Sequence, residues 1–421
     1  MTTLLDLAPA RCSGKPRGIA SICSAHPDVI GTTLAHGRER GREVLIEATC
    51  NQVNQEGGYT GMTPADFRRF VFEKAKAAGY DTAKLILGGD HLGPNPWRQF
   101  EAEEAMAKAE AMMAAYVAAG FGKIHLDASM GCNGEPEALD DETTAGRAAR
   151  LTRVAEQTAR DNGLPPPVYI IGTEVPVPGG AWHALDGLQP TAAGAARQTI
   201  ETHRTIFRQQ GVEAALDRVI GLVVQPGVEF GHEEVVVYQP DKARDLVGVL
   251  DNEPSLVFEA HSTDYQPREK LTRLVADGFA ILKVGPGLTF AWREALYGLD
   301  LIAGELDASY GERSLAKAME ALMLAEPGYW QRYYQGDAAS QHVLRHYSYS
   351  DRIRYYWPHP VAAAAVARLS QALAGRALPP TLVHQFVAAV TGHEGPLDMA
   401  TCLSLAIRAV LDDYAEATAA Q

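Results

Sequence analysis

KLILGGD (Lys84–Asp90) and KIHLDAS (Lys123–Ser129) are two of eight short apolar runs that end in polar residues and decide the fold of this chain. The other six are IASICSA (Ile19–Ala25), VLIEATC (Val44–Cys50), VYIIGTE (Val168–Glu174), VIGLVVQ (Val219–Gln225), SLVFEAH (Ser255–His261) and FAILKVG (Phe279–Gly285). Helix-like stretches separate the runs, and parallel strands that are covered on both faces have this near-continuous apolar composition. The pattern predicts eight βα units that close into a (β/α)8 TIM barrel, an α/β fold.

The chain is longer than one barrel needs. It has 421 residues, whereas a barrel typically takes about 250. Only helix-like stretches follow the eighth run, so we expect the barrel over residues 1–312 and a helical C-terminal domain over residues 313–421. The last predicted helix, Met399–Ala419, could be a core helix or a contact between copies of the chain in a homo-oligomer.

Composition narrows the class of protein. A net charge of −14 argues against a role in binding nucleic acid or a membrane surface. No apolar run reaches the roughly 18 residues that a membrane span needs, and the N-terminus lacks the basic and apolar regions of a secretory signal. Five scattered cysteines are typical of reduced thiols. We therefore expect a cytoplasmic protein.

The ends of the predicted strands carry candidate metal ligands. The carboxyl ends of barrel strands meet at one mouth, where active sites lie. His91 follows the third strand, Glu174 ends the fifth and His261 ends the seventh, and Gln225 on the sixth could add an oxygen. Imidazole with carboxylate suits zinc, and manganese, nickel or cobalt as divalent alternatives. Taken one at a time, each residue could instead be a hydrogen-bonded core residue.

Further strand-end residues suit proton transfer and phosphate binding. Asp90 adjoins His91, and Asp264 follows His261 by three residues, so either carboxylate could act as a general acid or base. Asp264 could equally cap a helix. Lys283, Gly285 and Gly287 lie where barrels often bind phosphate, although the glycines could simply make a turn and Lys283 could form a Schiff base.

Several longer strings resemble one protein family. They are CSAHP (Cys23–Pro27), LIEATCNQVNQEGGYTGMTPADFR (Leu45–Arg68), LGGDHLGPNPW (Leu87–Trp97), KIHLDASM (Lys123–Met130), IGTEVPVPGG (Ile171–Gly180), VVQPGVEFGH (Val223–His232), FEAHSTDYQ (Phe258–Gln266), AILKVGPGLTFAWREA (Ala280–Ala295) and SDRIRYYWPHP (Ser350–Pro360). The chain resembles the GatZ/KbaZ family of tagatose-bisphosphate aldolase subunits, whose members are sometimes labelled tagatose 6-phosphate kinases. The resemblance covers most of the chain, through about Pro360.

The resemblance implies a barrel related to the class II, metal-dependent aldolases. Some family members are described as non-catalytic partners of a separate aldolase subunit, and others as metal-dependent epimerases that interconvert tagatose 6-phosphate and fructose 6-phosphate at C4. The pair Asp90–His91 fits the aldolase pattern after the third strand. Those aldolases use further histidines after the sixth and seventh strands. Here the sixth strand ends in Gln225, which makes Glu174 the expected substitute.

We expect the epimerase activity, by cleavage and re-formation of the C3–C4 bond. Asp90 or Glu229 would take the proton of the C4 hydroxyl, and Lys283 with the Gly285 and Gly287 amides would hold the phosphate. Arg352 and Arg354 could reach over the mouth to help, or could form a solvated helix face. The sugar hydroxyls are assigned to the remaining polar strand-end residues Glu47, Asn51, Asp127 and Gln225.

Two other functions stay open. The chain could be a non-catalytic subunit of a class II tagatose-1,6-bisphosphate aldolase, a role that needs no intact metal site. A sugar-phosphate kinase is disfavoured because the sequence lacks the GxxxxGK[ST] phosphate-binding loop. Epimerisation through oxidation at C4 is disfavoured because no GxGxxG dinucleotide-binding motif is present.

Overall fold

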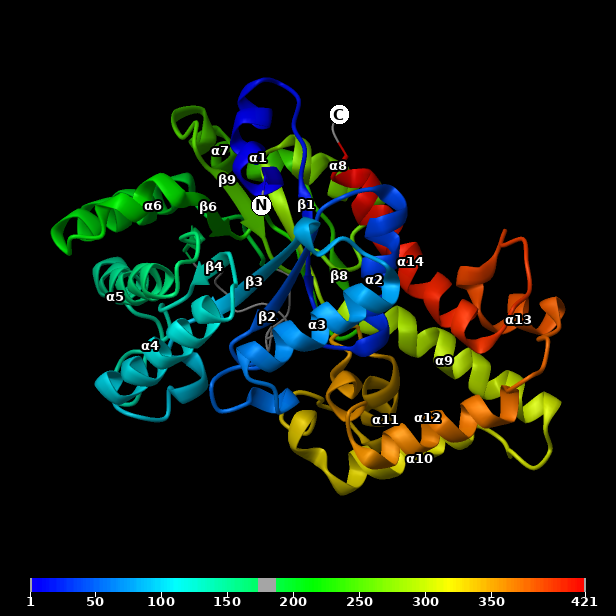
Figure 1. The fold of residues 1–421 in the computed structure, drawn as a ribbon. Helices are drawn as coiled ribbons and strands as arrows, with labels where there is room; N and C mark the ends of the chain where they lie inside the picture. The colour runs from blue at the N-terminus through cyan, green and yellow to red at the C-terminus, as the bar shows by residue number, and fades with distance from the viewer. Residues whose placement is uncertain (1, 173–186, 420–421) are drawn as a thin grey trace.

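All eight predicted runs form parallel strands that close into one barrel (Figure 1). The computed structural model describes residues 2–172 and 187–419. In barrel order the strands are β1 (Ile19–Cys23), β2 (Val44–Thr49), β3 (Leu85–Leu92), β4 (Lys123–Leu126), β5 (Val168–Ile171), β6 (Val219–Val224), β9 (Val257–Ala260) and β10 (Phe279–Val284), and β10 pairs back with β1. The predicted fold is thus confirmed. A small antiparallel hairpin, β7 (Glu229–Phe230) and β8 (Val235–Val236), follows β6.

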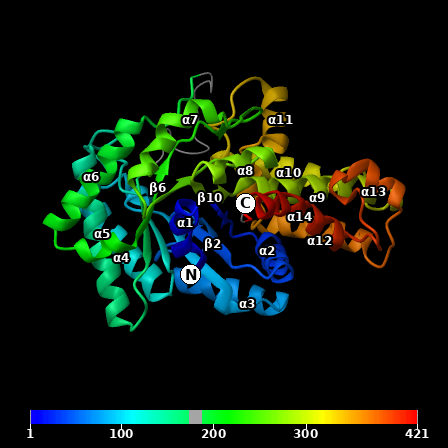
Figure 2. The same ribbon diagram turned by 90° about the horizontal axis from the view of Figure 1, so that it is seen from above.

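Helices surround the barrel, as the views in Figures 1 and 2 show. Between the strands lie α2 (Pro27–Arg40), α3 (Pro64–Ala78), α4 (Ala102–Ala118), α5 (Asp141–Asp161), α6 (Ala193–Gln209), α7 (Pro240–Val247) and α8 (Arg268–Ala276). Local sequence fixes their ends. At the start of α3, for example, Thr63 and Asp66 form a reciprocal capping box, and Gly79 ends the helix in a left-handed conformation.

An N-terminal helix that the sequence analysis did not anticipate, α1 (Thr2–Cys12), closes the amino end of the barrel. Its Leu4 and Leu7 are buried in one apolar cluster with Ile19, Leu45 and Ile281. These three residues lie on barrel strands, so this end of the barrel is sealed by aliphatic packing. The polar strand-end residues lie at the opposite, carboxyl end of the barrel, where we expect the active site.

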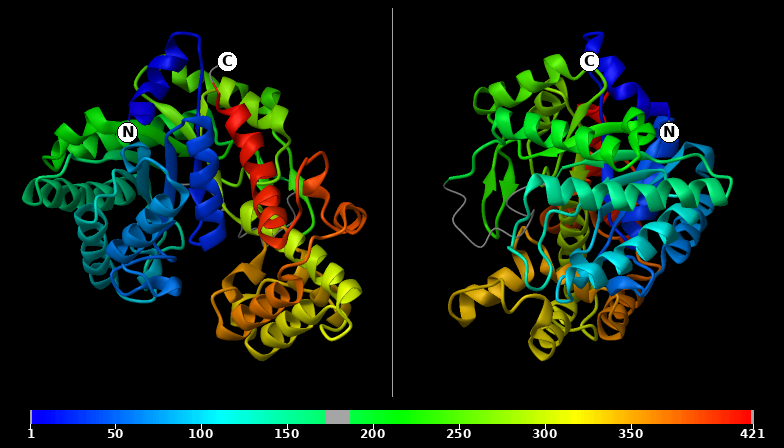
Figure 3. Two further views of the ribbon diagram at one scale, coloured as in Figure 1. Left: turned by 45° about the vertical axis from the view of Figure 1, so that its right-hand side comes forward. Right: turned by 90° about the vertical axis from the view of Figure 1, so that its left-hand side faces the viewer.

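After β10 the chain is helical in the part that the structure describes, with α9 (Pro286–Leu306), α10 (Ser314–Ala325), α11 (Ala338–Tyr347), α12 (Pro360–Leu373), α13 (Pro380–Phe386) and α14 (Met399–Ala417). Figures 1 and 3 show α10, α11 and α12 gathered beyond the carboxyl ends of the strands. The boundary at residue 312 stays a prediction.

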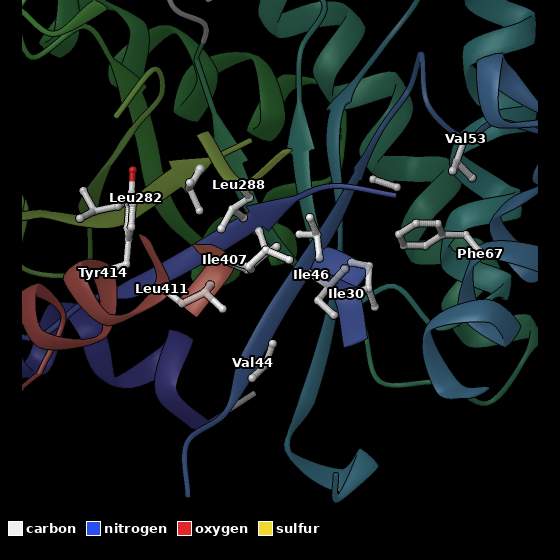
Figure 4. Close-up of a cluster of buried hydrophobic side chains, with 14 of the residues drawn as sticks. Ile30, Val44, Ile46, Val53, Phe67, Leu282, Leu288, Ile407, Leu411 and Tyr414 are labelled. Carbon is white, nitrogen blue, oxygen red and sulfur yellow. The ribbon is translucent and has the colours of Figure 1, made fainter. Parts of the chain in front are cut away.

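The last helix, α14, returns to the barrel and packs on α2, α8 and α9. Ile407, Leu411 and Tyr414 of α14 are buried against the same core as Ile30 and Leu282 (Figure 4). Burying a large apolar side chain contributes roughly 1.5–3 kcal/mol, so α14 is a core helix, packed among the helices that surround the barrel. No helix among the described residues is both long and apolar enough to cross a bilayer.

Candidate active site

A large pocket opens at the carboxyl ends of the barrel strands, with a volume of about 1910 Å³. Its floor includes Asp90, His91 and His261 from the ends of β3 and β9. Arg352 and Arg354, which lie beyond α11, contribute to its wall. The C-terminal part of the chain therefore builds the site together with the barrel.

His91 owes its position to an irregularity in β3. The register between β3 and β4 shifts between Gly89 and Leu92, which inserts one extra residue into β3. His91 lies in this bulge with φ of 51°, in the left-handed region that residues other than glycine rarely adopt. Such bulges redirect side chains beside active sites. The bulge brings the His91 ring to 4.9 Å from the rings of both His125 and His261, measured between centroids.

The three imidazoles are oriented in the same manner. His91 donates from Nδ1 to Asp127 (2.7 Å), His125 from Nε2 to the carbonyl oxygen of Gly172 (3.0 Å) and His261 from Nε2 to Glu259 (3.0 Å). These partners assign the tautomers, because a neutral ring that donates through one nitrogen carries its lone pair on the other. In His125 this other nitrogen, Nδ1, accepts a hydrogen bond from the backbone nitrogen of His91 (3.2 Å), which a bound cation would replace. Metal-bound histidines are held in this way, with the second ring nitrogen bonded to a carboxylate or carbonyl.

One nitrogen of each ring and a carboxylate oxygen of Asp90 all lie within 4.8 Å of one another. Burial lowers the pKa of His261 to about 3 against the opposing hydrogen bond to Glu259, so this imidazole is neutral. Burial raises the pKa of Asp90, but His91, Lys283 and His125 outweigh it and hold that pKa well below its usual value. Burial lowers the pKa of His91, but Asp90 and Asp127 outweigh it and raise that pKa, so a bound cation would displace the proton of this ring. Imidazoles and an ionised carboxylate are the donors that zinc and similar divalent cations prefer, so these residues fit such an ion.

Beneath this four-residue group lies a layer of buried ion pairs. The ammonium nitrogen of Lys123 is 2.5 Å from Glu47 and 2.7 Å from Glu259, and all three side chains are fully buried. The ammonium nitrogen of Lys283 is 2.6 Å from both Glu47 and Asp90. Burial lowers the pKa of each lysine, but the surrounding carboxylates outweigh it and raise the pKa above its usual value. Both lysines therefore stay charged.

This layer changes two sequence-based assignments. Lys283, expected to bind phosphate or form a Schiff base, is charged and held by carboxylates. Glu47, expected to contact sugar hydroxyls, is fully buried, does not line the pocket, and pairs with two lysines. The physical reason is that a buried ionised group is stable only beside an opposite charge, so Lys283 and Glu47 pair with neighbouring side chains instead of with a substrate.

The backbone amides of Gly285 and Gly287, which were expected to bind phosphate, donate hydrogen bonds to Asp264 instead. Its Oδ1 accepts hydrogen bonds from the Gly285 nitrogen (3.0 Å) and the Gly287 nitrogen (2.7 Å) at the start of α9. Asp264 thus caps a helix, as the alternative interpretation held, but that helix is α9 and not the directly following α8. Burial raises the pKa of Asp264 to about 6 in spite of these two hydrogen bonds. Asp264 lines the pocket, so it remains a candidate acid or base.

Two other predicted residues, Gln225 and Glu229, are not members of the four-residue group. Gln225 accepts hydrogen bonds from the Gly227 nitrogen (2.7 Å) and the Val228 nitrogen (2.8 Å), so its side-chain oxygen stabilises a turn. Glu229 is buried and accepts from the Phe230 nitrogen (2.9 Å). Glu174, the predicted carboxylate ligand, lies outside the described residues.

The remaining predicted residues lie at the pocket. Asn51 lines it, and so does Asp127, which orients His91 and accepts from Ser129 (3.0 Å). Arg354 donates to the Tyr355 hydroxyl (2.8 Å) and to the Asp351 carbonyl (3.1 Å). The guanidinium of Arg352 lies 3.3 Å from the centre of the Tyr333 ring.

Fold and geometry define the chain as a (β/α)8 barrel with a candidate metal site of three histidines and one aspartate at the carboxyl ends of its strands. The chain belongs to the family described as D-tagatose-1,6-bisphosphate aldolase subunit GatZ/KbaZ-like, whose model matches residues 4–419. It is 58% identical over 424 residues to a D-tagatose 6-phosphate 4-epimerase of Agrobacterium fabrum, covering 99% of each chain.

A solved structure supports the same fold. It is the crystal structure of a protein described as a probable tagatose 6 phosphate kinase from Sinorhizobium meliloti 1021, which shares 54% sequence identity and superposes with a TM-score of 0.88. The match covers 95% of this chain and 100% of that one.

Proposed function

We propose that this chain is a metal-dependent epimerase that interconverts tagatose 6-phosphate and fructose 6-phosphate at C4. The observation that carries the proposal is the grouping of His91, His125 and His261 with Asp90, in which one ligand atom of each residue lies within 4.8 Å of the others. The similarity to a relative named for this reaction supports the same substrate pair.

The two ketose phosphates differ only in the configuration of C4, so the enzyme must break and re-form a bond at that carbon. Cleavage between C3 and C4 needs a base for the C4 hydroxyl proton. It also needs stabilisation of the negative charge that develops on the fragment C1–C3, which keeps the ketose carbonyl. A divalent cation held by Asp90, His91, His125 and His261 would polarise the ketose carbonyl and stabilise that charge. Rotation of the aldehyde fragment before the bond re-forms would invert C4.

Asp264 is the residue that we assign to proton transfer. It lines the pocket, and its pKa of about 6 leaves it ionised at neutral pH but able to hold a proton transiently. It would take the proton of the C4 hydroxyl as C3–C4 breaks and return it to the aldehyde oxygen as the bond re-forms. Asp90, in contrast, is an ionised carboxylate paired with the Lys283 ammonium at 2.6 Å.

The C-terminal part of the chain would bind the phosphate. Lys283 also lines the pocket, but its ammonium is paired with carboxylates, and Asp264 takes the Gly285 and Gly287 amides. We therefore assign the phosphate to Arg352 and Arg354, which line the pocket and have guanidinium donors beyond those used within the chain. Arginine suits phosphate because its planar guanidinium donates two parallel hydrogen bonds. The phosphate would thus lie toward the C-terminal helices and the reacting carbons toward the histidines.

The test uses the purified chain alone with fructose 6-phosphate and added zinc, without ATP and without an aldolase. We expect tagatose 6-phosphate to form, and not to form after metal is removed with a chelator. An inert chain that accelerates a separate class II aldolase would instead identify the non-catalytic subunit. Conversion that requires ATP and gives a bisphosphate would identify a kinase.

A further inference from the structure

A second cluster of metal-ligating side chains lies away from the active-site histidines, where α10 meets α11. It consists of Glu320 on α10 and His342 and His346 on α11. One ligand atom from each of the three residues lies within 4.8 Å of the other two. No part of the proposed reaction uses these residues.

The helix brings the two histidines together. Residues four apart lie on the same face of a helix, and the rings of His342 and His346 are 4.8 Å apart between centroids. Glu320 reaches both from the neighbouring helix, with 3.0 Å from its Oε1 to Nδ1 of His342 and 3.0 Å from its Oε2 to Nε2 of His346. Zinc bonds of about 2.0–2.2 Å in a tetrahedron separate ligand atoms by roughly 3.3–3.5 Å. The two contacts of Glu320 are a few tenths of an ångström shorter than this separation, so they would lengthen slightly around a bound ion.

The surroundings hold these groups as a metal site would. The second nitrogen of His346, Nδ1, lies 2.6 Å from the Tyr297 hydroxyl. This hydroxyl oxygen can accept a hydrogen bond from Nδ1–H when Nε2 is bound to a metal. Arg345 donates to both oxygens of Glu320, from its Nε at 2.9 Å and from its Nη2. Carboxylates and histidines that bind metals are commonly supported by such outer hydrogen bonds.

The cluster is also accessible and correctly charged. The His342 side chain is 49% exposed, so an ion can enter from solvent and keep a water molecule as its fourth ligand. Burial lowers the pKa of His346 to about 4, which leaves a neutral imidazole. Burial raises the pKa of Glu320, but hydrogen bonds from Arg345 and His342 outweigh it and lower that pKa to about 2.

We propose that Glu320, His342 and His346 form a second metal site, which binds a divalent transition metal and prefers zinc. Two imidazoles and one carboxylate, with one open position, are a donor set that zinc accepts. The site joins α10 to α11, and α11 leads directly into the segment that carries Arg352 and Arg354 to the pocket. The ion would thus fix the base of the segment that we expect to bind phosphate.

The test measures bound zinc per chain after equilibration with zinc and removal of free ions. The variant His342→Ala should bind one equivalent less than the unchanged chain, and Glu320→Gln should behave in the same way. His393→Ala is the matched control, because His393 is an exposed histidine outside the cluster and its loss should leave the zinc content unchanged. With cobalt in place of zinc, His342→Ala should lose part of the visible absorption that tetrahedral cobalt gives.

The two metal sites can be distinguished. If the active-site group binds no zinc, the unchanged chain holds one equivalent and His342→Ala holds none, so the second site stands although the proposed function fails. Zinc content that is the same in His342→Ala, Glu320→Gln and the unchanged chain would overturn the second site. In that case the three residues form only a hydrogen-bonded polar cluster.

Discussion

Replacing Lys123 with methionine tests whether the ion-pair layer beneath the histidines is electrostatically balanced. The Lys123 ammonium is the nearest cation to one oxygen of Glu47 and one of Glu259, at 2.5 and 2.7 Å, in a fully buried setting. Methionine keeps much of the side-chain volume and removes the charge. Lys283 alone would then face Glu47, Glu259 and Asp90.

The size of the effect follows from burial. Removing one partner of a buried ion pair costs about 3–5 kcal/mol, because the other charge is left uncompensated. The unfolding entropy of about 2.1 cal/mol/K per residue amounts to roughly 0.9 kcal/mol/K for this chain. The melting temperature of Lys123→Met should therefore fall by about 3–6 °C, measured by calorimetry at neutral pH.

A matched lysine and a second substitution make this prediction specific. Lys76 is exposed on α3, so Lys76→Met should change the free energy of unfolding by no more than about 0.5 kcal/mol. Adding Glu259→Gln to Lys123→Met should recover part of the lost stability, because it removes one unpaired carboxylate. If Lys123→Met melts together with Lys76→Met, the layer does not depend on Lys123 and our account of the electrostatics is refuted.

Three further predictions concern the site itself. His261→Ala should lose active-site metal and epimerase activity together, as metal analysis and product assay would show, and a variant that keeps both would mean that His261 is not a ligand. Arg354→Ala should raise KM for fructose 6-phosphate at least tenfold while bound metal is unchanged; an unaltered KM would remove Arg354 from the phosphate site. Asp264→Asn should lower kcat about 100-fold or more, the usual contribution of a general acid–base residue. If Asp264 takes the proton as a carboxylate, as we propose, its pKa of about 6 means that activity of the unchanged chain should fall as pH drops below about 6. A pH profile that is identical in Asp264→Asn would exclude this role.

The barrel could be predicted from the sequence because each strand is a short apolar run that ends in polar residues. The α1 helix was missed because it precedes the first strand. Its Leu4 and Leu7 are buried only through contacts with residues of distant strands, which the local sequence does not indicate. The last predicted helix was placed correctly along the chain. Its packing against α2, α8 and α9 depends on contacts that no local pattern encodes.

The site was predicted in part. Asp90, His91 and His261 were expected at strand ends and lie together. His125, the fourth member of this group, was not among the predicted residues although it shares a strand face with Asp127, because the further metal ligands were sought on the fifth and sixth strands. Lys123 begins the same apolar run and shares that face. An apolar strand run that contains a lysine two residues before a histidine indicates that charged side chains face the inside of the barrel. This pattern could have predicted the buried Lys123.

The phosphate residues show why spacing alone was insufficient. Lys283, Gly285 and Gly287 lie where barrels often bind phosphate. In this structure, however, they bind carboxylates that lie on or shortly after other strands. Glu47 and Asp90 neutralise Lys283, and Asp264 takes the two amides. These three residues come close to Lys283 and the two amides only in the closed barrel.

The central claim is that the histidine site of this chain inverts C4 by breaking and re-forming the C3–C4 bond. Nuclear magnetic resonance of fructose 6-phosphate with the zinc-loaded chain in deuterium oxide tests it directly. Cleavage and recombination leave the hydrogens of C3 and C4 on their carbons, so we predict tagatose 6-phosphate without carbon-bound deuterium. Deuterium at C3 or C4, or no tagatose 6-phosphate at all, would contradict the account.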